Sequence, residues 1–173
     1  MNNSHRTAIS RRALSAPMTK LFVTGLLQGP ILDYGCGRGD DADRLSSVHG
    51  VTIEKYDPHY FPCYPDGWFK TTTCLYVLNV IPDQDERRRV VSDILHHTLL
   101  AGGNAYFAIR RGRDLKGWTS KGTWQGYVGD ELPTYDLSLL HRQSDYEIWW
   151  GKSAIPDGYI PVGKNTTLCI RSI

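Results

Sequence analysis

The sequence lacks the features that mark several common protein classes. Its 173 residues contain no run of eighteen apolar residues, so we expect no membrane-spanning helix. The basic N-terminus is followed by no apolar stretch before Pro17, and it therefore lacks the pattern of a secretory signal. The net charge of +2 is too small to indicate nucleic-acid binding by itself, because only a local cluster of cations would do so.

Cysteine is scarce and shows no pattern typical of a metal site. The four cysteines have no C-x-x-C spacing and no histidines placed to complete a zinc site. His96 and His97 are adjacent, and neighbours on a helix point about 100° apart, so they are poorly placed to share an ion. We therefore expect reduced thiols, no metal and a cytoplasmic location.

The composition is that of a folded protein. Hydrophobic residues make up 40% of the chain and charged residues 22%, and 173 residues are enough to bury a core. No internal repeat is visible. We expect one domain over residues 1–173, with an N-terminal helical segment at 1–29.

Helical and extended patterns alternate along most of the chain. The expected helices cover residues 10–27, 40–48 with Asp40 as the N-cap, and 82 to about 101. The expected strands cover residues 31–34, 51–56, 71–80, 104–109, 146–150 and 167–173. Residues 58–70 contain three prolines and are expected to be irregular. This order predicts an α/β sheet that is mainly parallel, with an antiparallel strand at its C-terminal end.

A glycine-rich turn separates the first of these strands from the next helix, in the stretch ILDYGCGRGDDADRL (31–45). Ligands of such folds bind at the carboxyl ends of the strands, beside this turn. Gly35, Gly37 and Gly39 would let the backbone approach a ligand closely. The dinucleotide fingerprint G-x-G-x-x-G needs glycine or alanine at position 40, where this chain has Asp40.

The charge around the turn is more informative about the ligand than the spacing of its glycines. Four aspartates flank the glycines, and two arginines offset only part of their charge. Such a turn repels a pyrophosphate and attracts a ligand with an ammonium and a sulfonium, which S-adenosylmethionine has. Asp57, at the end of the second strand, is placed to accept the ribose hydroxyls, or else to serve as a turn residue. Asp40 and Asp41 have a helix-capping role as the alternative.

The motif ILDYGCGRG resembles the first motif of the class I S-adenosylmethionine-dependent methyltransferases. Within that superfamily, the combination of DYGCGRGDD, YDP, YVLNVI and KGTWQ is similar to that of the DNA phosphorothioation-associated methyltransferases, from about Thr7 to Gln125. The resemblance implies a Rossmann-like methyltransferase sheet with helices on both faces, and S-adenosylmethionine as the cofactor. The cofactor-binding residues that it implies are Asp33, Gly35, Cys36, Gly37, Gly39, Asp57, Pro58 and Leu78.

A second stretch, residues 110–128, is the candidate acceptor-binding loop. It interleaves cations with tryptophans, which would neutralise phosphates and stack on bases, although solvated cations and packed tryptophans are the alternative. Nucleic acid is therefore one candidate acceptor. The residues expected to contact the acceptor are Arg110, Arg111, Trp118, Lys121, Trp124 and Gln125.

Methyl transfer needs little from the protein beyond alignment and desolvation. If the acceptor must lose a proton, His59, Tyr76 and His141 are weak candidates for the base. Asn79 would bind an amine or an amide of the acceptor, or cap the backbone. We predict a methyltransferase with an unidentified acceptor. The alternatives are a non-catalytic cofactor-binding subunit of a modification complex and, less favoured because of Asp40, an NAD-dependent oxidoreductase.

Overall fold

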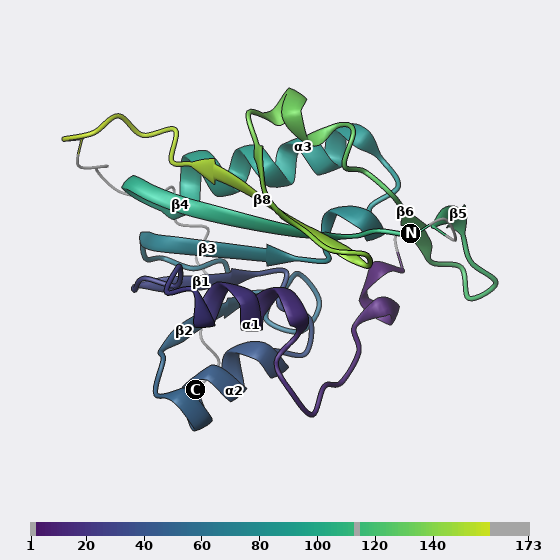
Figure 1. Cartoon of the computed structure of the whole chain (residues 1–173), viewed down its shortest axis with the longest axis horizontal. Coiled ribbons are helices and arrows are strands. Elements are labelled where there is room, and N and C mark those ends of the chain that lie inside the picture. Colours follow the sequence, from purple (N-terminus) through teal and green to yellow (C-terminus); the bar gives the residue numbers. More distant parts are fainter. Residues whose placement is uncertain (1–2, 113–114, 160–173) are drawn as a thin grey trace.

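A computed structural model describes residues 3–112 and 115–159, in which a six-stranded sheet has the order β2-β1-β3-β4-β8-β7 (Figure 1). Its strands are β1 (Ile31–Tyr34), β2 (Ile53–Tyr56), β3 (Phe69–Leu75), β4 (Leu99–Arg110), β7 (Ser138–Arg142) and β8 (Tyr146–Lys152). β2, β1, β3 and β4 pair in parallel, β8 is antiparallel to β4, and β7 is antiparallel to β8. The predicted mainly parallel sheet with an antiparallel C-terminal strand is confirmed.

Helices cover both faces of the sheet, as expected (Figure 1). α1 (Ala16–Val23) and α2 (Asp40–His49) pack on one face, where Met18 and Leu45 meet Ile31. α3 (Gln84–Asp93) and the π-helical turn after it, Ile94–Thr98, pack on the other. No helix of the described residues is long and apolar enough to cross a membrane.

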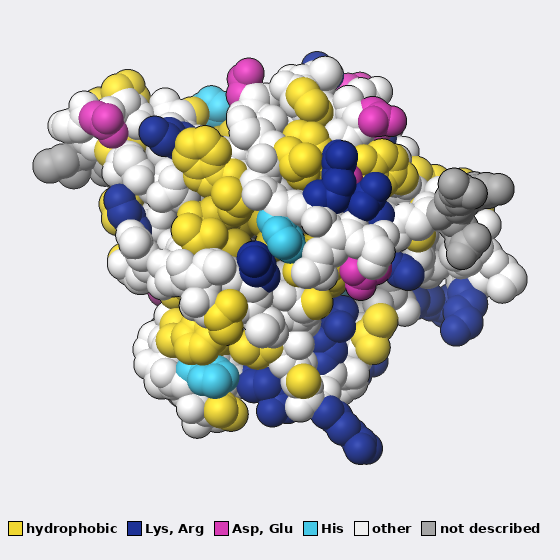
Figure 2. Space-filling model, viewed as in Figure 1, with side chains coloured by type: hydrophobic (Ala, Val, Ile, Leu, Met, Phe, Trp, Pro, Cys, Tyr) yellow, Lys and Arg dark blue, Asp and Glu magenta, His cyan; other side chains and the backbone are white. Residues whose placement is uncertain are grey.

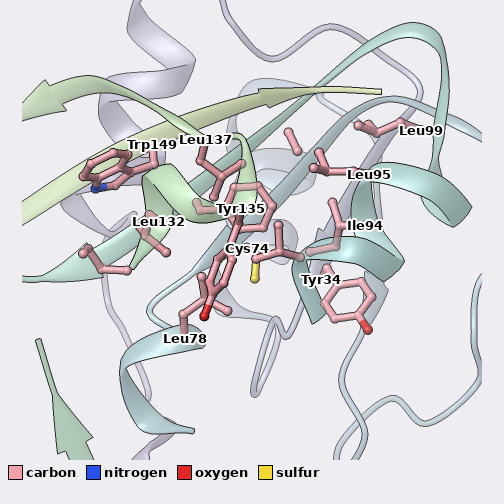
Figure 3. Close-up of a cluster of buried hydrophobic side chains, with 14 of the residues drawn as sticks. Tyr34, Cys74, Leu78, Ile94, Leu95, Leu99, Leu132, Tyr135, Leu137 and Trp149 are labelled. Carbon is pink, nitrogen blue, oxygen red and sulfur yellow. The ribbon is translucent and has the colours of Figure 1, made fainter. Parts of the chain in front are cut away.

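Alternation along β1 divides its side chains between the two faces. Ile31 faces α1 and α2, whereas Leu32 and Tyr34 join the larger core on the side of α3. Figure 3 shows this larger core, with Ile94 and Leu95 in the same cluster as Tyr34. Because β1 is buried on both faces, its sequence reads as a short apolar run interrupted by Asp33.

The starting residues of the two helices beside the glycine turn are set by hydrogen bonds from backbone N–H groups to side-chain oxygens. α1 begins after Ser15, whose hydroxyl accepts the N–H of Met18, so the helix is shorter than the predicted 10–27. The predicted N-cap of α2 was wrong. Gly39, with φ of 81°, is the N-cap, because the Asp40 carboxylate accepts the backbone N–H of Arg11 at 2.6 Å.

Two further predicted boundaries, the end of a strand and the end of a helix, were also wrong. The strand expected over 71–80 ends at Leu75, because Tyr76 takes a left-handed conformation with φ of 62° and Leu78–Val80 form a 3₁₀ turn. The helix expected to reach 101 gives way to β4 at Leu99. The hydroxyls of Thr98 and of Thr72 in β3 are hydrogen-bonded to each other at 2.9 Å, which ties the helix end to the sheet.

The C-terminal third differs most from the expectation. The expected strand 167–173 lies outside the described residues. The outer neighbour of β8 is β7, which was not predicted. The candidate acceptor loop contains a hairpin of β5 (Lys116–Trp118) and β6 (Trp124–Gly126). The stretch expected to be irregular, residues 58–70, forms no helix or regular strand up to residue 68, apart from the isolated bridge between Asp57 and Phe61, but its last two residues belong to β3.

Glu147 of β8 is a fully buried carboxylate that joins β7, β8 and the segment around the hairpin. It accepts the ring N–H of Trp149 at 2.9 Å and the hydroxyl of Tyr127 at 3.1 Å. Arg142 and Arg111 form ion pairs with it at 2.8 and 3.2 Å. A carboxylate with this many donors compensates for its own burial.

We expect Glu147→Ala to lower the free energy of unfolding by about 3 kcal/mol or more, because it leaves buried donors and cations without their acceptor. Urea unfolding of the purified protein measures this change. Glu54→Ala, which removes an exposed glutamate of β2, is the matched control and should stay within about 0.5 kcal/mol of wild type. Equal effects of the two substitutions would contradict this role of Glu147.

Candidate functional site

A cavity of about 440 Å³ lies at the carboxyl ends of β1, β2 and β3, where the fold predicts a ligand site. The glycine turn forms one wall, and the segment after β3, from Tyr76 to Ile81, contributes another. The N-terminal strap, which we define as residues 3–15, forms the third. Figure 2 shows Lys and Arg side chains gathered over the strap and near the β5–β6 hairpin.

Two aspartates of α2 hold the strap in place. Asp40 accepts the N–H of Arg11, and Asp41 accepts both the N–H and the hydroxyl of Ser15 at 2.7 and 2.6 Å. At the other end of the strap, the ring of His5 stacks on His59 with 4.2 Å between centroids. The strap therefore spans the cavity from β2 to α2 with both ends anchored.

The glycine turn is bound to the end of β2. The N–H groups of Gly35 and Cys36 both donate to the carbonyl of Tyr56, at 2.7 and 3.1 Å. Gly35 has φ of 73°, and a Cβ at this position would overlap the side chain of Val77. Glycine is therefore required where the turn meets the segment after β3.

Asp57 ties the glycine turn to the irregular stretch that follows β2. One carboxylate oxygen accepts the N–H of Gly37 at 3.0 Å, and the other accepts those of His59 and Tyr60 at 2.9 and 3.0 Å. Asp57 is thus a turn residue and also lines the cavity. A carboxylate has about four acceptor positions, so these three bonds leave room for a ligand hydroxyl.

Asp33 lies at the back of the cavity and is only 4% exposed. It accepts the hydroxyl of Thr73 at 2.8 Å. Burial, followed by the charge of Asp41, raises the pKa of Asp33 to about 7, and the hydrogen bond from Thr73 opposes this shift only in part. A cation bound nearby would favour the ionised form. Cys36 also lines the cavity, and burial raises the pKa of its thiol, so the thiol stays protonated.

Most of the residues expected at the cofactor meet at this cavity. Those that line it are Asp33, Gly35, Cys36, Gly37, Asp57 and Pro58. Gly39 lies beside Lys55 and Phe61 as the cap of α2, and Leu78 is fully buried in the larger core (Figure 3). Sequence reasoning missed the strap altogether. The signal that was available was Asp40 and Asp41, which were read as caps or as ligand-facing charges.

The candidates for a catalytic role separate into two groups. His59 and Tyr76 line the cavity, whereas Asn79 and His141 do not. Burial raises the pKa of Tyr76 to about 12, so its hydroxyl is protonated at neutral pH and acts as a donor. His141 lies on β7, with its ring 5.8 Å from that of Tyr146.

The residues of the candidate acceptor loop lie outside the cavity and have different surroundings. Arg110 donates to Gln125 at 3.1 Å, and Arg111 is paired with Glu147. The ring of Trp124 lies under Arg87, 5.4 Å from the guanidinium carbon. Trp118 is 65% exposed and Lys121 is also exposed, so both side chains are accessible on the hairpin.

Asn79 is buried next to the cavity wall, in the 3₁₀ turn that packs against β6. Its exposure is 1%, and neither atom of its amide has a hydrogen-bond partner among the described residues. The capping role considered for Asn79 therefore has no hydrogen bond to support it. Among the described residues, no group of three or more His, Cys, Asp or Glu side chains is placed to hold a metal ion.

Comparison with solved structures identifies the fold. The CcbJ methyltransferase from Streptomyces caelestis is similar over 88% of this chain and 96% of its own, with a TM-score of 0.60 and 13% identity. The 1,6-didemethyltoxoflavin-N1-methyltransferase from Burkholderia thailandensis, with bound 1,6-didemethyltoxoflavin and S-adenosylhomocysteine, is similar over 78% of this chain and 76% of its own, with a TM-score of 0.58 and 14% identity. This chain has a Rossmann-like methyltransferase fold.

The N-methyltransferase NodS from Bradyrhizobium japonicum WM9, in complex with S-adenosylhomocysteine, is similar over 89% of each chain, with a TM-score of 0.51 and 14% identity. No family model matches the sequence. No curated protein matches it either. The similar solved structures support the class I methyltransferase fold. Nothing in the comparisons links the chain to the DNA phosphorothioation-associated group.

We expect the stability of the protein to fall with rising pH because of Asp33. Between its ordinary pKa of 3.8 and the folded value of about 7, the folded state holds a proton that the unfolded state has lost. The free energy of unfolding then decreases as the pH rises, by at most about 1.4 kcal/mol per pH unit. Asp33→Asn removes this contribution and should flatten the profile between about pH 4 and 7, as measured by urea unfolding. Identical slopes in both proteins would rule out the shift.

We expect Asn79→Leu to raise the free energy of unfolding by about 1 kcal/mol, because it replaces a buried amide without partners by an apolar group of similar size. Thermal and urea unfolding measure the change. Asn104→Leu is the control and should lower the free energy of unfolding, because the Asn104 oxygen accepts the ring N–H of Trp150 at 2.9 Å. Loss of stability in both variants would show that the Asn79 amide is satisfied in solution.

Proposed function

We propose that this protein transfers a methyl group from S-adenosylmethionine to an acceptor that reaches the same cavity. The observation that carries the proposal is the cavity itself, in which a glycine turn and three aspartates (Asp33, Asp41 and Asp57) meet at the carboxyl edge of a methyltransferase fold. Two of the structurally similar enzymes were crystallised with S-adenosylhomocysteine, the product that remains after S-adenosylmethionine loses its methyl group.

The donors and charges of the cavity fit this cofactor. The cavity volume of about 440 Å³ lies within the range of sites that bind one small molecule. Asp33 and Asp41 attract an ammonium and a sulfonium, and they disfavour the pyrophosphate of a dinucleotide. Asp57 lies at the end of β2, where a free acceptor position would take a ribose hydroxyl. Pro58 and His59 are the next residues along the same wall and would lie near the adenine.

The protein's own contribution to the reaction would be alignment and exclusion of water. S-adenosylmethionine supplies an activated methyl group on its sulfonium when it is bound. The strap and the segment after β3 line the site, and Tyr76 would offer a hydroxyl donor to the acceptor. His59 is the titratable side chain on the wall that would remove a proton from an acceptor amine or hydroxyl if one must be lost.

The exposed part of the hairpin favours an acceptor that extends beyond the cavity. Trp118 and Lys121 lie outside the cavity, so they would contact the acceptor only if it is larger than the space inside. Stacking on tryptophan and neutralisation of phosphate by lysine are the interactions that a nucleic acid would use. A non-catalytic cofactor-binding subunit would share the cavity but transfer no methyl group.

We expect Asp57→Ala to weaken S-adenosylmethionine binding by about tenfold or more, because it removes a ribose acceptor and the anchor of the Gly37 N–H. Isothermal titration calorimetry measures the affinity. Asp43→Ala is the matched control, because Asp43 is 63% exposed, pairs with Lys55 and lies outside the cavity. Wild-type protein that binds NAD and not S-adenosylmethionine would overturn the proposal in favour of the oxidoreductase.

Methyl transfer itself is tested by incubating the protein with methyl-labelled cofactor and separate fractions of DNA, tRNA, protein and metabolites. We expect label to enter one fraction. If that fraction is nucleic acid, Trp118→Ala with Lys121→Ala should reduce labelling and leave cofactor affinity unchanged, since both residues lie outside the cavity. Cofactor binding without label in any fraction would support the non-catalytic alternative instead.

A further inference from the structure

Tyr76 joins the cavity to the carboxyl end of β4. It lines the cavity, its backbone N–H donates to the carbonyl of Ala108 at 2.8 Å, and its side chain packs against the cluster that contains Ala108. Side chains of a strand alternate between faces, so Arg110 lies on the same face of β4 as Ala108. Tyr76 has φ of 62°, and such strained positions of bulky residues are concentrated at ligand sites.

Two arginines from different elements lie near Tyr76. The guanidinium of Arg11, in the strap, lies over its ring at 5.8 Å from the centroid. Burial raises the pKa of Tyr76 to about 12, the charges of Arg11 and Arg110 oppose this shift, and the charge of Asp145 adds to it. Within residues 3–112 and 115–159, neither arginine forms an ion pair. An anionic group beside Tyr76 would therefore meet two cations that no acid neutralises.

The cations continue outside the cavity along the β5–β6 hairpin. Arg110 donates to Gln125 of β6 at 3.1 Å, which links the end of β4 to the hairpin. Lys121 is exposed in the turn of the hairpin. This turn lies beside the start of the strap, since a Cβ on Gly122 would be 3.8 Å from Nδ2 of Asn3. Figure 2 shows Lys and Arg side chains gathered over the strap and near the hairpin. We call Arg11, Arg110 and Lys121 the basic track.

The extent of the basic track and an exposed tryptophan indicate which anion fits. A small anion at Tyr76 would contact the two arginines and would leave Lys121 without a role. Trp118 is 65% exposed on the same hairpin, and an aromatic side chain beside cations is a stacking site for a base, which an acidic peptide lacks. A base reaches a cavity only when it is not stacked in a duplex. These features together favour a single strand.

We propose that the acceptor is a single-stranded nucleic acid, whose phosphates bind along the basic track while one base passes Tyr76 into the cavity; this inference rests on the proposed function. A second base stacks on Trp118 outside the cavity. In the transfer, the acceptor atom of the inserted base gives its lone pair to the methyl carbon, and the carbon–sulfur bond breaks with its electron pair on sulfur. His59 takes any proton that the acceptor atom must lose.

Fluorescence anisotropy with labelled single strands of about 20 nucleotides, one of DNA and one of RNA, tests the binding without the cofactor. Wild-type protein should bind at least one of them, and more weakly at about 200 mM than at about 50 mM salt, because phosphate contacts release counterions. A duplex of the same sequence should bind about fivefold or more weakly, because its bases are stacked on one another. The strand that binds more tightly identifies the sugar of the acceptor.

Substitutions separate the two kinds of contact. Arg110→Ala should weaken single-strand binding and reduce the slope of log affinity against log salt by about 0.7, the value for one phosphate contact on a single strand. Arg110→Lys should retain the slope, because it keeps the charge. Trp118→Ala should weaken binding about fivefold or more with an unchanged slope, because it removes a stacking surface and no charge.

Lys152→Ala is the matched control, because Lys152 is an exposed cation at the opposite end of the β4–β8 pair from Arg110. It should bind the strands like wild type. A wild-type slope in Arg110→Ala would overturn the inference. So would failure to bind either strand, equal binding of the duplex, or displacement of the strand by polyglutamate at equal charge.

Calorimetry with S-adenosylmethionine, carried out without a strand, keeps the two proposals separate. Cofactor binding by a protein that binds no strand would leave the proposed function in place and overturn this inference alone. Strand binding by a protein that does not bind S-adenosylmethionine would overturn the proposed function, and with it the role of the strand as acceptor.

Discussion

The attachment of the N-terminal strap to α2 is the interaction on which the site depends. Asp40 and Asp41 accept N–H groups from the strap backbone. The part of the strap between the 3₁₀ turn at Ser4–Thr7 and α1 has no regular secondary structure, and these bonds fix it as a wall of the cavity. These carboxylates are satisfied largely by neutral donors. At the back of the cavity, burial, followed by the charge of Asp41, raises the pKa of Asp33. Arg11, whose backbone Asp40 holds, also lines the cavity.

Much of the architecture could be predicted because, at β1 and the glycine turn, the local sequence pattern matches the structure that the fold requires. Ile31–Tyr34 is buried on both faces and ends at glycine, which is how a central parallel strand reads. The turn after it needs glycine at Gly35 for a steric reason, which makes the motif recognisable. Asp57 was assigned to this site from its position alone, and the structure places it on the cavity wall, where its carboxylate accepts the N–H of Gly37.

The features that could not be predicted depend on contacts between distant parts of the chain. Asp40 looked like a helix cap because its partner, the N–H of Arg11, is 29 residues away in sequence. Trp124 looked like a stacking residue because nothing in the sequence shows that Arg87 lies over its ring. β7 was missed because its apolar residues are exposed at the sheet edge and give no alternating pattern.

A crystal structure of the protein with S-adenosylhomocysteine tests the central claim most directly. The account predicts ligand density in the cavity between the glycine turn and the strap. The ribose should lie against Asp57 and the amino-acid end beside Asp33 and Asp41. Density at another place, or an empty cavity at a saturating concentration of the ligand, would contradict the assignment of this cavity as the cofactor site.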